Sequence, residues 1–231
     1  MKKQVLIGFL AVGLLICLTG APAHAQDKVD VFAGYSFGTT NFGCISSSCY
    51  DPAIHGYAAA FAYNFNRHIG LEANFSGHNG TSTLDHEPAT STSDGYTDSV
   101  RQDAYFYTFG PRLTVPVGRF SIFGHFLVGA AHIHEGLQYM CLPSTGSESC
   151  GTPDNYHITG NGFAFKTGGG VDWNHGHWGI RILEVDFIRT EFQVTEIENC
   201  SECSTTPYTY PVPGSNFELS AGIKFNFGGK Q

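Results

Sequence analysis

The final stretch of the chain, residues 215–227, alternates apolar and polar side chains at every second position. The apolar positions are Phe217, Leu219, Ala221, Ile223, Phe225 and Phe227. Because successive side chains of a strand point to opposite faces, this period predicts a strand with one wholly apolar face. About eleven such residues can cross a bilayer at a tilt. A strand at the end of the chain needs a partner in lipid, so we expect it to pair with the first strand and close a barrel.

Four residues in this stretch carry a more specific pattern. Ser220, Gly222, Phe225 and Phe227 form a Ser-x-Gly-x-x-Phe-x-Phe spacing. This spacing resembles the terminal-strand insertion signal of bacterial outer-membrane barrels, although residues 228–231 follow the last aromatic, where many barrels end on it. The resemblance implies that the barrel-assembly machinery is a partner of this chain.

Residues 1–25 read as a secretory signal peptide. Lys2 and Lys3 precede an apolar run from Val5 to Leu18, and Ala23-His24-Ala25 is a small-x-small cleavage site. The pattern predicts export and a single mature domain of residues 26–231. Cleavage removes two of the 12 basic residues, leaving ten against 20 acidic ones. Such an acidic chain offers no basic surface for nucleic acid.

Seven further segments show the same alternation as the last one. They cover residues 29–37, about 54–65, 69–76, about 105–115, 119 to about 132, about 162–173 and 178–192. We expect short turns at 66–68, 116–118 and 174–177, and long loops at 38–53, 77–101, 135–158 and 193–214. This asymmetry is typical of outer-membrane barrels, and aromatic residues near the strand ends favour a membrane barrel over a soluble β-sandwich. The predicted fold is all-β, an eight-stranded antiparallel up-and-down transmembrane β-barrel.

The last three predicted strands carry a second resemblance. Residues 168–173, 180–181, 184–190 and 219–223 look like the sixth, seventh and eighth strands of the small eight-stranded outer-membrane β-barrel proteins. This group is similar to the transmembrane domain of the OmpA-type proteins. The resemblance implies the barrel fold and a location in the bacterial outer membrane, with outer-membrane lipid and lipopolysaccharide as surroundings. It implies little about activity.

The polar faces of the predicted strands supply charged residues of both signs to the barrel interior. These are Glu72, Arg112, Lys166, Arg181, Glu184, Asp186, Glu218 and Lys224. Eight strands enclose a space that side chains just fill, so these charges must pair or hold water. A structural ion-pair core and a narrow gated ion path are both compatible with this set. Arg181 and Glu184 are three apart, so sharing one face requires a β-bulge near Ile182 and Leu183.

Six cysteines remain after cleavage, in three local pairs within polar loops. Export into an oxidising compartment predicts the disulfides Cys44–Cys49, Cys141–Cys150 and Cys200–Cys203. The alternative is a thiol metal or redox site, since Cys200 and Cys203 have a two-residue spacing. That spacing alone is a weak indication.

Several of the eleven histidines have spacings that would suit metal ligands or a catalytic base. His132 and His134, and His175 and His177, could each share a strand face, but the sequence identifies no further ligands, so exposed rim positions and no metal are expected. No His-x-Ser spacing of the kind expected in lipid-modifying barrels occurs, and His125 has no evident partner.

The sequence therefore predicts a non-enzymatic outer-membrane protein without a cofactor. Its barrel would anchor disulfide-stapled extracellular loops for surface interaction or envelope integrity, with an extracellular protein or surface ligand as partner. A narrow porin-like channel for ions or small solutes is the alternative function.

Overall fold

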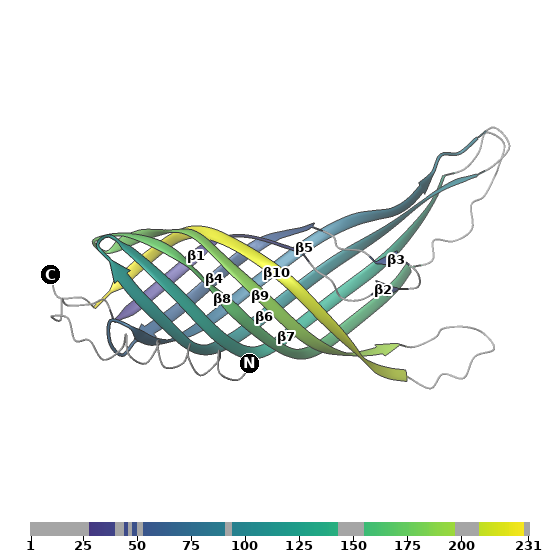
Figure 1. The fold of residues 1–231 in the computed structure, drawn as a ribbon. Helices are drawn as coiled ribbons and strands as arrows, with labels where there is room; N and C mark the ends of the chain where they lie inside the picture. The colour runs from purple at the N-terminus through teal and green to yellow at the C-terminus, as the bar shows by residue number, and fades with distance from the viewer. Residues whose placement is uncertain are drawn as a thin grey trace, which may run out of the picture.

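The computed structural model describes residues 28–39, 44–45, 48–49, 53–90, 94–142, 155–196 and 208–228. Eight strands form a closed barrel in which each strand is antiparallel to its neighbours (Figure 1). The strands are β1 (Val29–Thr39), β4 (Ala53–Asn64), β5 (Ile69–Glu87), β6 (Gly95–Val117), β7 (Phe120–Leu142), β8 (Asn155–His175), β9 (Trp178–Glu196) and β10 (Tyr208–Phe227). A separate hairpin pairs β2 (Cys44–Ile45) with β3 (Ser48–Cys49). The predicted signal peptide lies outside the described residues.

The first and last strands close the ring. β1 pairs with β10 from Val29 opposite Phe227 to Thr39 opposite Phe217. Figure 1 shows the two strands side by side, purple against yellow. This pairing confirms the predicted barrel closure, and it leaves no free edge between the first and last strands.

The outer surface of the ring is an apolar belt. Phe61 and Phe225 are each 50% exposed and Phe109 is 53% exposed, whereas alternate residues of the same strands are buried, mainly polar on β10 and mainly alanine on β4. A water-soluble protein seldom exposes so many large apolar side chains in one continuous band. The arrangement of apolar side chains outside and polar side chains inside is that of a transmembrane β-barrel. Among the residues that the structure describes, no α-helix has the length and hydrophobicity that a membrane span requires.

Short turns join the strands at one end of the barrel. Gly118 and Gly176, in the β6–β7 and β8–β9 turns, have φ of 63° and 64°, which a residue with a Cβ adopts reluctantly. In the β4–β5 turn, the Asn66 Oδ1 atom accepts hydrogen bonds from the backbone N–H groups of His68 and Ile69 at 2.8 and 2.9 Å. The predicted turns are therefore present, although β6 and β8 each run about two residues further than predicted.

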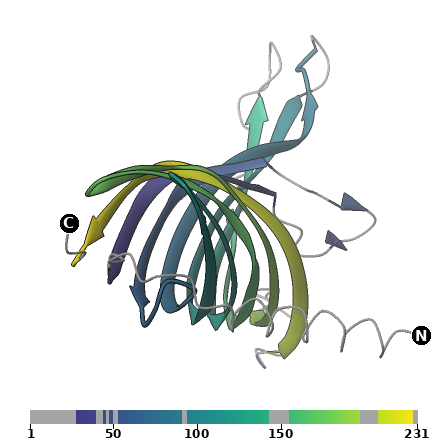
Figure 2. The ribbon, with the colours of Figure 1, turned by 60° about the vertical axis from the view of Figure 1, so that its left-hand side comes forward.

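The strands are longer at the opposite end than the sequence analysis predicted. The segments 77–101 and 135–158 were expected to be loops, yet β5 runs to Glu87, β6 begins at Gly95 and β7 runs to Leu142. These extensions pair with one another as a three-stranded arm beyond the barrel wall (Figures 1 and 2). The prediction was wrong because it required each strand to have an apolar face. Strands that are exposed to water on both faces can instead consist of polar residues, here with many Thr and Ser.

The last strand also begins earlier than predicted, at Tyr208 instead of residue 215. Its added residues include Pro211 and Pro213, which cannot donate backbone hydrogen bonds. β1 reaches only to Phe217, so the added segment pairs with β9 alone and both prolines lie on a sheet edge, where they are tolerated.

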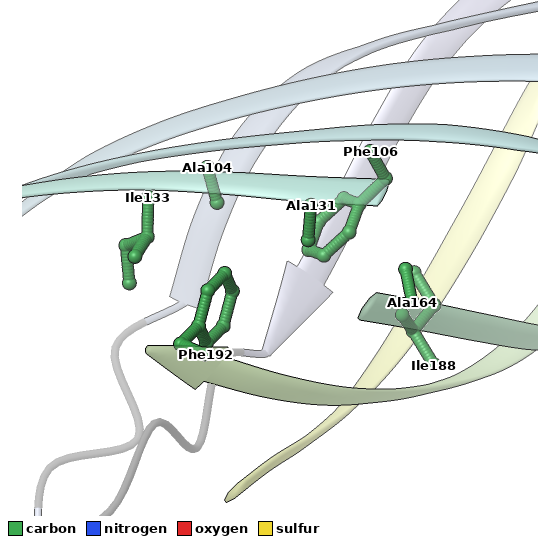
Figure 3. Packing of buried hydrophobic residues seen from close by; sticks show 7 residues of the cluster. All are labelled: Ala104, Phe106, Ala131, Ile133, Ala164, Ile188 and Phe192. Carbon is green, nitrogen blue, oxygen red and sulfur yellow. The ribbon is translucent and has the colours of Figure 1, made fainter. Parts of the chain in front are cut away.

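An apolar cluster occupies the interior on the long-loop side. It consists of Ala104, Phe106, Ala131, Ile133, Ala164, Ile188 and Phe192, with Val212 packed against it (Figure 3). Toward the short turns, the next inward-facing residues of β8 and β9 are Lys166 and Asp186. On the β6–β9 side of the barrel the apolar cluster therefore lies between the charged interior and the long-loop end, whereas β5 and β10 place the buried polar residues His78 and Asn216 opposite Ala104 and Ile188.

Candidate functional site

The barrel interior below the apolar cluster holds a network of ion pairs. All eight charged residues expected to face inward are buried, with exposures between 0% for Lys166 and 4% for Lys224. Each lies on a strand whose alternate residues meet lipid, and the period of two is enough to position all of them except the pair Arg181 and Glu184. The eight are Glu72, Arg112, Lys166, Arg181, Glu184, Asp186, Glu218 and Lys224.

A β-bulge brings two of these residues onto the same face. On β9, Arg181 lies opposite Gly222 and Glu184 lies opposite Ser220, so one residue of β10 faces two of β9. Ile182 and Leu183 both point to lipid, at 51% and 46% exposure. The predicted bulge is thus present, and it allows Arg181 Nη1 to lie 2.9 Å from Glu184 Oε2.

Asp172 joins three cations and was missed by the sequence analysis. Its Oδ1 atom accepts a hydrogen bond from Arg181 Nε at 2.9 Å, and its Oδ2 atom lies 3.1 Å from Arg112 Nη2 and 3.2 Å from Lys224 Nζ. Asp172 is six positions from Lys166 on β8, so the period of two already places both inside. That parity was the indication that could have identified it.

Lys166 organises the part of the network nearest the apolar cluster. Its ammonium group lies 3.0 Å from Glu218 Oε1, 3.2 Å from Asp186 Oδ2 and 3.0 Å from Asn74 Oδ1. The second oxygen of Glu218 accepts a hydrogen bond from Ser76 Oγ at 2.8 Å. A fully buried ammonium group needs such partners, since an unpaired charge in this position would be costly.

His125 is a member of the network, and the prediction that it has no partner was wrong. Its Nε2 atom lies 2.9 Å from Asp186 Oδ1, and its Nδ1 atom lies 3.2 Å from Glu72 Oε1 and 3.8 Å from Glu184 Oε1. The partners come from β5 and β9, far from His125 in sequence, so no local spacing could reveal them. His125 lies two residues from both Phe123 and Leu127, which are buried as well, and this period of two was the available indication that it faces inward.

Aromatic rings support the two buried arginines. The Arg181 guanidinium carbon lies 4.1 Å from the Phe32 ring centre and 4.3 Å from that of Phe123. Arg112 lies on Phe123 as well, at 4.1 Å. Stacking on aromatic faces stabilises a guanidinium while leaving its N–H groups free to bind carboxylates in its plane.

The other predicted histidine pairs lie near the two ends of the barrel. His132 Nδ1 lies 2.7 Å from Asn161 Oδ1, and His134 Nδ1 lies 3.1 Å from Thr159 Oγ1 on the adjacent strand. His175 stacks on Trp173 with ring centres 5.6 Å apart, beside the turn that carries His177. The structure thus does not bring the two pairs together.

The residues of the predicted insertion signal divide between the two faces of β10. Phe225 and Phe227 point to lipid, whereas Ser220 is buried and donates a hydrogen bond to Glu184 Oε2 at 2.7 Å. Gly222 lies opposite Gly34, where an added Cβ would come within 2.4 Å of the Ala33 carbonyl oxygen. Ser220 and Gly222 thus each have a structural role in the barrel wall besides any role in recognition.

Three of the six cysteines of the predicted disulfides lie outside the described residues. Cys44 lies opposite Cys49 in the β2–β3 hairpin, a register that suits their predicted bridge. Cys141, near the end of β7, is disulfide-bonded, while Cys150 and the pair Cys200 and Cys203 are not among the described residues. All three predicted pairings therefore stay predictions.

No protein-family model and no curated protein matches the sequence. The attachment invasion locus protein Ail of Yersinia pestis is similar in structure, with a TM-score of 0.46 at 15% identity over 87% of this chain and 99% of Ail. OprG of Pseudomonas aeruginosa has a TM-score of 0.41 at 11% identity, over 89% of this chain and 98% of OprG. The protease OmpT of Escherichia coli has a TM-score of 0.38 at 10% identity, over 90% of this chain and 100% of OmpT.

OprG is named as an outer-membrane protein and OmpT as an outer-membrane protease, whereas Ail is named for attachment and invasion. This chain is a small outer-membrane β-barrel protein, as its closed ring and outward apolar belt indicate. Its function has to be inferred from its own interior and its own arm.

Proposed function

We propose that this protein is a non-enzymatic outer-membrane anchor that presents the β5–β7 arm and disulfide-stapled loops to partners outside the cell. The observation that carries the proposal is the filled interior, in which paired charges and an apolar cluster occupy the space within the ring. A barrel of this size has room for little else once its inward side chains are in place.

The alternative function, a narrow ion channel, is less well supported. An ion moving from the short turns would first meet fixed pairs such as Arg112–Glu72, at 3.1 Å, and then apolar side chains including Phe106 and Phe192. Hydrophobic constrictions stop conduction by excluding water. The same arrangement suits a barrel whose role is to hold the chain in the membrane.

A catalytic role is also less well supported. Ser36 Oγ lies 2.8 Å from His78 Nε2, and Glu218 Oε2 lies 3.7 Å from the same nitrogen, so the carboxylate does not orient the opposite ring nitrogen as in a catalytic triad. Ser36 is 0% exposed, so a substrate could not reach it.

The arm supplies the binding surface in this proposal. Its strands carry exposed polar side chains such as Thr81, Thr83 and Arg101 and lie at the end where the connections are long. In barrels with short periplasmic turns, the long connections are extracellular. An extracellular protein or a surface ligand, including lipopolysaccharide, is the proposed class of partner.

Two measurements test the proposal. Refolded protein in planar bilayers is expected to give no steady openings, and steady openings abolished by Arg112→Met or Glu184→Gln would establish the channel instead. On intact cells, a membrane-impermeant maleimide should label Thr81→Cys in the arm and spare the matched variant Arg119→Cys in the β6–β7 turn. The reverse labelling would refute the orientation.

A further inference from the structure

Three buried atoms in the network converge without hydrogen bonds. They are Glu72 Oε1, His125 Nδ1 and Glu184 Oε1, which lie within 4.8 Å of one another. None of the three has a hydrogen-bond partner in the described part of the chain, and none of their side chains is more than 1% exposed. Buried polar atoms are nearly always satisfied, so three that point at one spot call for an explanation.

The other atoms of these same groups are held in place. Asp186 Oδ1 lies 2.9 Å from His125 Nε2, Arg112 Nη1 donates to Glu72 Oε2 at 3.1 Å, and Arg181 Nη1 donates to Glu184 Oε2 at 2.9 Å. A carboxylate on one nitrogen of a histidine directs the lone pair of the other nitrogen outward, and metal-bound histidines commonly have such a carboxylate. Each group thus has one atom fixed by a partner and one atom pointing to the common centre.

Two of the three separations fall in the range expected for a shared metal ion, and the third is within 4.8 Å. His125 Nδ1 lies 3.2 Å from Glu72 Oε1 and 3.8 Å from Glu184 Oε1. Ligand atoms that bind one Zn²⁺ ion at about 2.0–2.2 Å lie about 3–4 Å from each other. One imidazole nitrogen and two carboxylate oxygens form a donor set typical of first-row divalent transition metals.

The buried charges also leave room for a cation. The described residues bury five carboxylates, those of Glu72, Asp172, Glu184, Asp186 and Glu218, against four permanent cations, those of Arg112, Lys166, Arg181 and Lys224. Asp30, whose carboxylate lies 3.9 Å from Lys224 Nζ, adds a sixth negative charge at the edge of the network. Buried charges are stable only when they are compensated, and a divalent ion would balance these six carboxylates.

We propose that Glu72, His125 and Glu184 bind a first-row divalent transition-metal ion that links β5, β7 and β9 inside the barrel. The ion links three strands of which no two are adjacent in the barrel, and it gives each of the three converging atoms a partner. A protonated His125 is the competing source of positive charge. It would donate from Nδ1 to Glu72 and leave Glu184 Oε1 without a partner.

The test uses Co²⁺ as the probe, supplied during refolding of untagged protein in detergent because the site is closed to solvent. We expect one Co²⁺ per barrel after dialysis, a visible absorption band, and an upward shift of the urea unfolding midpoint. Glu72→Gln, Glu184→Gln and His125→Gln should each weaken binding at least tenfold. The matched controls are Glu191→Gln, an exposed carboxylate on β9, and His132→Gln, a half-buried histidine on β7, and both should bind Co²⁺ normally because they lie outside the buried network.

The wild-type protein alone can also decide the question if a variant fails to fold. X-ray absorption of the Co²⁺-loaded barrel should show a single imidazole nitrogen and otherwise oxygen ligands. Loss of all Co²⁺ on dialysis would overturn the proposal, as would a site with two or more imidazoles, or binding unaffected by the triad variants. The conductance and labelling outcomes that test the anchor function do not depend on this result.

Discussion

Arg181 and Glu184 form an ion pair of 2.9 Å across a β-bulge of the same strand, three positions apart. The bulge makes Ile182 and Leu183 share the lipid face, and it turns the two charged groups inward together. Arg181 also binds Asp172 and stacks on two aromatic rings, so one side chain connects the bulge to β8, β1 and β7.

The first prediction concerns this arginine. Arg181→Met should lower the free energy of unfolding by about 3–5 kcal/mol, because it leaves buried carboxylates without their partner. Urea unfolding of refolded protein in detergent measures the change. Arg189→Met removes an exposed guanidinium that donates a hydrogen bond to Ser215 Oγ at 2.6 Å, and it should lower the free energy of unfolding by less than about 1 kcal/mol. Equal losses in the two variants would contradict a special role for the network.

A second prediction concerns the closing seam. Gly222→Ala places a methyl group 2.4 Å from the Ala33 carbonyl oxygen and from Gly34 Cα, so β1 and β10 must separate. The folded fraction, read from heat-modifiable migration on gels, should fall sharply. Gly124→Ala is the matched control, since its nearest neighbouring atom would be 3.5 Å from the added carbon, an ordinary contact. Normal folding of Gly222→Ala would show that the seam can adjust.

A third prediction separates lipid contact from insertion recognition. Phe227→Ala should reduce the amount of protein in the outer membrane while export continues, because Phe227 belongs to the terminal pattern. Ile223→Ala removes a side chain of similar exposure, 54% against 52%, from the same face of β10 and lies outside that pattern. Fractionation of cells into periplasm and outer membrane compares the two. The same defect in both variants would assign the effect to lost lipid contact.

A fourth prediction concerns the disulfides. Peptide mapping without reduction should link Cys44 to Cys49, Cys141 to Cys150 and Cys200 to Cys203. Bonds that close such short loops contribute at most about 2–3 kcal/mol each, whereas the ladder of the closed ring does not depend on them. Reductant should therefore leave the barrel folded in detergent. Unfolding on reduction alone would show a larger role, and a fragment joining Cys44 to Cys141 would refute the pairing.

The sequence predicted the barrel because lipid imposes a simple rule on every strand that crosses it. Outward residues such as Phe61, Phe109 and Phe225 follow that rule, and parity then assigned inward residues such as Lys166 and Glu218. The β9 bulge could be predicted because Arg181 and Glu184 are three positions apart, a spacing that a regular strand places on opposite faces. Above the membrane the rule no longer applies, so the β5–β7 arm was interpreted as loops.

The period of two along each strand could not predict which inward-facing side chains form ion pairs with each other. Asp172 and His125 were predictable as inward residues, but their partners lie on strands up to 61 residues away in sequence. Those contacts depend on the tilt of the strands and on the stagger between them. The convergence of Glu72, His125 and Glu184 could therefore be seen only in three dimensions.

The buried ion pairs also select the stagger between neighbouring strands, which sets the shear number of the barrel. A strand that slipped by two residues would still present apolar side chains to lipid, because the outer pattern repeats every two positions. Such a slip would move Asp172 about 7 Å along β8, away from both arginines and Lys224, since each residue advances a strand by about 3.3 Å. Lipid alone therefore permits several staggers of the same eight strands, and the buried charges distinguish the native one from the others.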